Sequence, residues 1–193
     1  RDGLTEDGAY YLNGAETDAE LQAIEREDDW RWAIASEDEW YKAAYHANDG
    51  VTANYFDHAT SNDGAPSAQA PPGTAVNGAA NFDSVVGDLT DVGAYNAKPS
   101  DSPYGTYDQA GNVWEWNEAI LGADLDKRGI RGGAYNSGGL TISAGYRNMS
   151  ADPTDEFSNL GFRVTTVPVP AAAWLGLPAL AWLVRCSRRR ADR

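Results

Sequence analysis

The part of this chain best equipped for chemistry is the run from Tyr104 to Trp116, which packs two tryptophans, carboxylates and a turn glycine into a short stretch. Asp108, Gly111, Val113 and Glu115 fall at relative positions one, four, six and eight. In an irregular loop, this spacing lets two carboxylates and two backbone carbonyls converge on one hard cation. Calcium prefers such an all-oxygen shell, with about six to eight ligands. The sequence therefore predicts a calcium site here.

Two capping boxes predict short helices in the N-terminal part of the chain. The segments Thr17–Glu20 and Ser36–Glu39 each begin with a hydroxyl residue and have a glutamate three positions later. In the second helix, Trp40, Ala43 and Ala44 recur at helical spacing and form an apolar stripe. Because such stripes pack against other elements, we expect Trp40 in the core rather than against a ligand.

Beyond these helices, the pattern predicts loops and short strands. Residues 48–80 are rich in Asn, Asp, Gly, Ala, Ser and Pro and predict a long surface loop. Short strands are expected near Gly129–Ala134, Ile142–Arg147 and Gly161–Thr165.

The distribution of charge excludes one class of partner. The 193 residues carry a formal charge of −14, but residues 185–193 hold five arginines and one aspartate. Ten basic and 28 acidic residues remain before this tail, a formal charge of −18. Nucleic acid binding needs a basic face, so we expect no nucleic acid partner. We interpret the acidic residues as a solvated surface, with divalent-cation binding as the alternative for part of it.

Several motifs, in a characteristic order, resemble those of the formylglycine-generating enzyme (sulfatase-modifying factor) family. They are the signature Gly-Asn-Val-Trp-Glu-Trp at 111–116, the helix Ile34–Ala44, and the segments Arg131–Tyr135, Ala144–Arg147 and Asn159–Val164. The resemblance runs from about Gly8 to Thr166 and implies the α+β, C-type-lectin-like fold of that family. Such a fold has few short helices, short antiparallel strands and much irregular loop.

The family's oxidation chemistry requires two cysteines that bind copper, and the resemblance places Ser143 and Asn148 at those positions. Neither an alcohol nor an amide is a soft copper(I) ligand. Cys186, the single cysteine, cannot substitute, because it lies beyond the apolar run 167–184 that we expect to span a membrane. We therefore expect neither copper binding nor formylglycine formation.

The family resemblance also implies two calcium sites. The resemblance assigns one ion to the side chains of Asp108 and Glu115 and the carbonyls of Gly111 and Val113. It assigns a second ion to the Asn81 side chain and the Phe82 carbonyl. A downstream aspartate completes the second site, and both Asp83 and Asp88 are candidates.

Two further groups of residues, the histidines and three arginines, have simpler interpretations. A related branch of the superfamily holds iron with three histidines, whereas this chain has only His46 and His58. Arg131, Arg147 and Arg163 recur within the matched motifs, and we expect them to pair with the many carboxylates.

The end of the chain predicts a sorting device. Residues 167–184 form an uncharged apolar run long enough to span a bilayer, and the basic tail 185–193 follows on the side expected to be cytoplasmic. The start of the run resembles the Val-Pro-Leu-Pro-Ala variant of PEP-CTERM signals. This resemblance implies export in a Gram-negative bacterium, an exosortase-type protease as partner, and a membrane-anchored or cell-surface location. The chain begins with Arg1, so we expect residues 1–166 to be a domain truncated or processed at its N-terminus.

These features favour an exported, calcium-stabilised extracellular module that binds an unknown ligand and lacks the catalytic cysteine pair. The alternative is a divergent metal-dependent oxidoreductase or protein-modifying enzyme of the sulfatase-modifying factor and non-haem iron superfamily. A third, weaker interpretation is a display protein of the kind that retroelements diversify, which shares this fold. Such proteins have Asn-rich variable stretches, whereas only Asn136 and Asn148 lie between residues 131 and 158.

Overall fold

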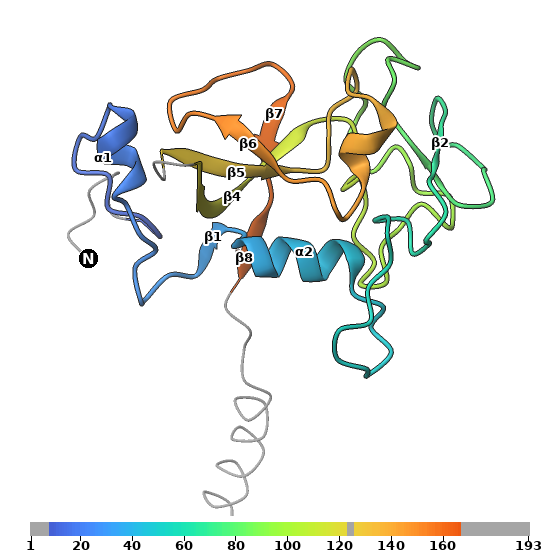
Figure 1. The fold of residues 1–193 in the computed structure, drawn as a ribbon, viewed down its shortest axis with the longest axis horizontal. Coiled ribbons are helices and arrows are strands. Elements are labelled where there is room, and N and C mark those ends of the chain that lie inside the picture. Colours follow the sequence, from blue (N-terminus) through green and yellow to red (C-terminus); the bar gives the residue numbers. More distant parts are fainter. Residues whose placement is uncertain (1–7, 123–125, 167–193) are drawn as a thin grey trace, which may run out of the picture.

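The computed structural model describes residues 8–122 and 126–166 (Figure 1). This part of the chain is a mixed arrangement of small helices and strands joined by long irregular segments. In chain order the elements are α1 (Asp18–Gln22), β1 (Trp32–Ile34), α2 (Glu37–Tyr45), β2 (Ser67–Ala68), β3 (Ala79–Ala80), β4 (Trp114–Leu121), β5 (Lys127–Arg131), the 3-10 helix η1 (Gly139–Ile142), β6 (Asn148–Ala151), β7 (Leu160–Phe162) and β8 (Val164–Thr166).

Both α-helices begin at the predicted capping boxes. At α1, the Thr17 hydroxyl accepts a hydrogen bond from the Glu20 amide, and the Glu20 carboxylate accepts one from the Thr17 amide at 3.0 Å. Ser36 and Glu39 exchange the same two bonds at α2. Each box satisfies amides that a helix N-terminus otherwise leaves without intrahelical partners.

Helix α2 contributes the centre of the hydrophobic core. Trp40 is only 1% exposed, which confirms its predicted core position, and Ala44 and Tyr45 are buried beside it. Ala43, a member of the predicted stripe, is only half-buried, whereas Tyr45 is fully buried. The other buried members of the core are Ala35, Ala59, Ala80, Phe82, Ala110, Ile142 and Ala144. Truncating a buried tryptophan costs about 3–5 kcal/mol, so Trp40 is a principal contact holding α2 in place.

A four-stranded sheet lies above α2 in the view of Figure 1 and has the order β6-β5-β4-β7. Strands β4, β5 and β6 pair antiparallel, whereas β4 and β7 run parallel. Parallel neighbours need a crossover connection, and here the chain crosses from β6 at one edge of the sheet to β7 at the other. The expectation of antiparallel strands is therefore wrong for this pair, and also for β2 and β3.

The predicted strands agree only partly with the structure. Strand β5 overlaps the start of the one expected at Gly129–Ala134. The strand expected at Ile142–Arg147 is wrong, because Ile142 ends η1 and a turn follows, closed by a bond from the Tyr146 amide to the Ser143 carbonyl at 3.1 Å. The next strand, β6, begins only at Asn148.

Two other segments differ from the sequence-based expectation because their strands pair with partners that are distant in the chain. The segment Gly161–Thr165 forms two strands, since β7 pairs with β4 and β8 pairs with β1. Strand β4 falls where no strand was expected, so the predicted calcium loop ends at Val113 and Glu115 lies within the sheet.

Residues 48–80 are mostly irregular but not confined to the surface. His58, Ala59 and Thr60 are buried, as are Ala79 and Ala80 at the end of the segment. The expectation of a simple surface loop is wrong in this respect, because short apolar residues within it complete the core around α2.

In the part of the chain that the structure describes, no helix is long and apolar enough to cross a membrane. The predicted membrane segment at 167–184 and the basic tail at 185–193 lie outside the described residues.

Candidate functional site

The predicted calcium loop lies side by side with the Asn81 segment. Asn81 and Gly111 form a parallel β-bridge, and the Asn112 amide donates to the Asn81 carbonyl at 2.8 Å. Gly111 has a φ of +81°, and a Cβ at this position would collide with the Asn81 carbonyl. Glycine is therefore required for the close approach that brings the two proposed ligand sets together.

Within the part of the chain that the structure describes, Asp108 and Asn81 each present an oxygen atom that lacks a hydrogen-bond partner. Asp108 Oδ2 accepts from the Gly93 amide at 2.6 Å, whereas its Oδ1 is buried without a partner among the described residues. Asn81 is fully buried, and its Nδ2 donates to the Asp88 carbonyl at 2.9 Å and to Asn112 Oδ1 at 3.2 Å. Its Oδ1 is the second orphaned oxygen in this region. Buried oxygens of this kind call for a cation or an ordered water.

Glu115 is held by an ion pair with Arg163, a specific partner that the sequence did not identify. Arg163 donates to both carboxylate oxygens at 2.6 Å, and Trp40 Nε1 donates to Oε2 at 2.6 Å. Glu115 as a whole is 4% exposed. Burial raises the pKa of Glu115, while the Arg163 guanidinium and the Trp40 indole oppose this rise. Oε2 thus accepts two bonds and Oε1 one, which leaves Oε1 with capacity for a further ligand.

The remaining predicted ligands sit at the edges of this region. Val113 directly precedes β4, and its side chain lies against Gly161 of β7. The Phe82 side chain is buried in the core, and its carbonyl accepts from the Val85 amide at 3.1 Å. Within residues 8–122 and 126–166, no group of three or more His, Cys, Asp or Glu side chains is placed to hold a metal. A calcium ion here would therefore depend on carbonyl and amide oxygens as well as on Asp108 and Glu115.

Ser143 and Asn148 occupy different elements. Ser143 follows η1 and its hydroxyl donates to the Leu140 carbonyl at 2.9 Å, while its backbone bridges to His58. Asn148 begins β6 and pairs with Ile130 of β5, which in turn pairs with Trp116 of β4. Directly paired residues face the same side of a sheet. Asn148 therefore lies on the sheet face of Trp114 and Trp116, opposite to Glu115.

The three arginines of the matched motifs form ion pairs, as expected. Arg131 contacts Glu37 Oε1 through Nη2 at 2.5 Å and Arg147 approaches the same oxygen at 3.5 Å, while Arg163 binds Glu115. Arg131 also donates to the Ala144 and Tyr146 carbonyls at 3.0 and 2.7 Å. These arginines join α2 to the sheet and to the turn after η1.

A family model for the sulfatase-modifying factor enzyme 1-like domain matches residues 7–167. The chain belongs to this family. One relative from Bos taurus, named "Inactive C-alpha-formylglycine-generating enzyme 2", is 39% identical over 78 residues, which is 37% of this chain and 26% of that protein. The chain thus matches about a quarter of the length of this curated relative.

Solved structures also resemble this sulfatase-modifying factor domain. The Treponema denticola variable protein 1 superposes with a TM-score of 0.53 at 22% identity, over 79% of this chain and 55% of that one. A structure titled CarF gives a TM-score of 0.49 at 20% identity, over 76% and 52% of the two chains. At this level of identity, the likeness to the variable protein shows the fold alone.

The two histidines of the sulfatase-modifying factor domain have local roles. His46 is the residue that caps the C-terminus of α2, and its ring contacts the Val51 carbonyl at 3.1 Å and the Tyr104 hydroxyl at 3.0 Å. His58 lies in the irregular segment between α2 and β2 but is only 8% exposed. Its ring bonds to the Ile142 carbonyl, and burial lowers its pKa.

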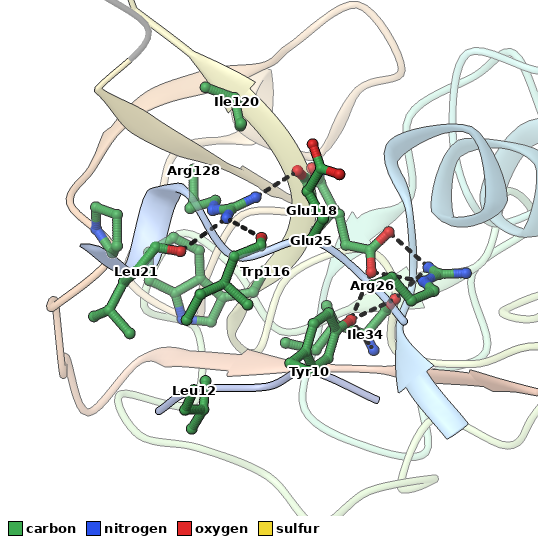
Figure 2. A pocket seen from close by; sticks show the side chains of 13 residues that line it. Tyr10, Leu12, Leu21, Glu25, Arg26, Ile34, Trp116, Glu118, Ile120 and Arg128 are labelled. Carbon is green, nitrogen blue, oxygen red and sulfur yellow. Dashed lines mark hydrogen bonds and ion pairs between the residues drawn. The ribbon is translucent and has the colours of Figure 1, made fainter. Parts of the chain in front are cut away.

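A hollow that sequence reasoning missed lies between α1 and the hairpin of β4 and β5 (Figure 2). Its volume is about 410 Å³, and we name it the α1 hollow. Its apolar lining consists of Leu12, Leu21, Ile24, Ile34, Trp116, Ile120 and Pro153, and its polar lining of Tyr10, Glu25, Arg26, Asn117, Glu118 and Arg128. These residues come from six separate segments of the chain, so no local sequence pattern predicts the hollow.

Proposed function

We propose that this domain is a non-catalytic member of the sulfatase-modifying factor family: an exported, calcium-stabilised module that binds a ligand outside the cell. The observation that carries this proposal is the pair Ser143 and Asn148 at the positions where the family's oxidation chemistry needs two thiolates. Copper(I) favours soft sulfur ligands, which neither side chain offers. Cys186 is the only cysteine of the chain and lies in the predicted basic tail.

The name of the Bos taurus relative supports a role without catalysis, since that protein is itself called inactive. It is 39% identical to this chain over the matched segment, so loss of the activity has a parallel within the family. Members that keep the fold without the chemistry are expected, because function resides in sites grafted onto folds.

Calcium is proposed as a structural ligand of the Asp108 loop. Asp108 Oδ1 and the carbonyls of Gly111 and Val113 would bind it together with Oε1 of Glu115. The orphaned Asp108 oxygen supports this assignment, and so does the single bond that Oε1 accepts. The ion would supply positive charge to a strongly acidic domain and fix the loop from which β4 starts.

A second ion is proposed at Asn81 and the Phe82 carbonyl. The buried and orphaned Asn81 Oδ1 supports this site. Of the two candidate aspartates, Asp88 is favoured, because its carbonyl already accepts from Asn81 Nδ2 at 2.9 Å. The Asp83 amide instead donates a hydrogen bond to the Ser137 carbonyl at 2.9 Å.

Export and sorting are proposed from the sequence of the C-terminal part. Residues 167–184 would span the membrane, and the arginines of 185–193 would stay on the cytoplasmic side because they cannot cross a bilayer cheaply. An exosortase-type protease of a Gram-negative bacterium would then process the segment, and the acidic domain would face the exterior.

The absence of catalysis can be measured directly. The protein is incubated with a peptide containing Cys-x-Pro-x-Arg, copper, reductant and oxygen, and the peptide is analysed by mass spectrometry. We expect no Cys-to-aldehyde conversion above a no-protein control. The double variant S143C/N148C is the matched comparison, because it restores thiols at the two positions. Conversion by the unmodified protein would overturn the proposal.

A further inference from the structure

We propose that the α1 hollow binds an organic cation with an apolar body. This inference names the ligand class of the binding module proposed above and therefore rests on that function. The apolar body would lie against Leu12, Leu21 and Trp116, and the cationic nitrogen at the acidic edge of the hollow (Figure 2).

The walls of the hollow are suited to an apolar group. Leu12 and Ile120 remain 44% and 40% exposed in the folded domain, and Leu21, Ile24 and Trp116 are only half-buried. Ligand sites in proteins are concave, mostly apolar and about 300–1,000 Å³ in volume, and the α1 hollow of about 410 Å³ falls in this range.

The two guanidinium groups of the lining donate to acceptors of the protein itself, so few of their N–H groups are left to bind an anion. Arg26 donates to Glu118 twice at 2.7 Å, to Glu39 at 3.0 Å and to the Ile34 carbonyl at 2.8 Å. Arg128 donates to the carbonyls of Leu21, Gln22 and Ile24 at 3.0 Å and to that of Glu118 at 2.9 Å.

The Tyr10 hydroxyl, which also lines the hollow, is hydrogen-bonded within the protein. It donates to Glu118 Oε1 at 2.6 Å and accepts from the Ile34 amide at 2.9 Å. Burial and the neighbouring Glu118 carboxylate raise the pKa of Tyr10 to about 12. Tyr10 therefore stays neutral at ordinary pH, and the negative charge of Glu118 is balanced by Arg26.

Carboxylates gather beside the hollow. A second depression of about 490 Å³ shares Ile24, Glu25 and Arg26 with it. We name as the acidic rim the exposed carboxylates lining this depression, which are Glu25, Glu27, Asp28 and Asp29. Arg26 also lines this depression, and its guanidinium forms ion pairs with Glu39 and Glu118.

Charge complementarity therefore selects the ligand. An anion would be repelled by the acidic rim, whereas an ammonium or guanidinium group would be attracted there. Trp116 adds an aromatic wall that can also receive a cation. A free amine and a basic residue beside an apolar one in a peptide share this chemistry.

The test uses 3-phenylpropylamine and the capped peptide acetyl-Leu-Arg-Leu-amide as the two possible sources. Their anionic counterparts are 3-phenylpropionic acid and acetyl-Leu-Glu-Leu-amide. Binding to the full chain is followed by the NMR shift of the Trp116 indole N–H, assigned with Trp116→Phe. We expect saturable shifts with at least one cationic probe, weakening as salt rises. The cationic probe whose NMR shifts saturate shows whether the ligand is a free amine or a basic residue of a peptide.

Variants locate the site. Glu25→Gln with Glu27→Gln should weaken the cationic probe about 3- to 10-fold, and Leu12→Ser about fivefold. Matched controls are Glu156→Gln, an exposed carboxylate elsewhere, and Leu140→Ser at a residue that is 83% exposed. These should leave the Kd unchanged.

Three results would overturn the inference: no saturation with either cationic probe, equal binding of the anionic counterparts, or a Kd that the rim and wall variants do not change. Calcium-dependent melting and the peptide-oxidation assay do not involve this hollow. If both behave as proposed while the cations fail, the calcium-stabilised, non-catalytic module stands and only this ligand class is wrong.

Discussion

Arg163 and Glu115 meet in two parallel hydrogen bonds, Nε to Oε2 and Nη2 to Oε1, each 2.6 Å long. Trp40 adds a third bond from its indole nitrogen to Oε2. The contact joins α2, the start of β4 and the residue that separates β7 from β8. Because Glu115 is 4% exposed, removal of either partner would leave a buried charge with fewer compensating contacts.

Arg163→Met is therefore expected to lower the free energy of unfolding by about 3–5 kcal/mol, measured by urea denaturation. Arg147→Met is the matched control, because that side chain is 37% exposed and its Nε lies 3.5 Å from Glu37. An exposed pair of this kind contributes at most about 1 kcal/mol. Equal losses for the two variants would show that the buried pair has no special weight.

Acid should destabilise the domain through His58. Burial lowers the pKa of this ring below its ordinary value, so the unfolded chain binds the proton more readily. The contribution of neutral His58 is present above about pH 6.5 and is lost as the pH falls through the lower folded pKa. We expect the melting temperature to fall between pH 7.5 and 5.5, and His58→Gln to show a smaller fall. Identical pH profiles for the unmodified protein and His58→Gln would contradict this reasoning.

Truncation after Thr166 should leave a soluble domain with a cooperative melt. The apolar run 167–184 contains Pro168, Pro170 and Pro178, which would interrupt a packed core helix but are tolerated in a membrane segment. Circular dichroism of the truncated chain measures this. Aggregation or loss of the cooperative transition, with a full chain that folds without detergent, would place the tail in the core.

Local signals were read correctly from the sequence. The capping boxes at Thr17 and Ser36 depend on four neighbouring residues, and both form. The stripe containing Trp40 depends on one helical turn, and Trp40 is buried. The arginines of the matched motifs could be paired with carboxylates from charge alone, although not with the correct partners.

Features fixed by long-range contacts were missed. Strand β4 exists because β5 and β7 pair with it, while its own sequence is dominated by the tryptophans and Glu115. The start of β6 is shifted to Asn148 by the turn that follows η1. The partners of Glu115 and the α1 hollow depend on residues far apart in the chain, such as Tyr10 and Glu118, which no spacing rule connects.

The central claim is that calcium stabilises the Asp108 loop. Asp108→Asn is the most direct probe, because a change at Glu115 would also break its pair with Arg163. Thermal melting is compared in excess calcium and in excess chelator, with Asp91→Asn at an exposed position as control. At a hundredfold excess over Kd, a bound ion stabilises by about 2.7 kcal/mol. We predict a higher melting temperature in calcium for the unmodified protein and the control, and little difference for Asp108→Asn. Equal melting of the unmodified protein with and without calcium would contradict the claim.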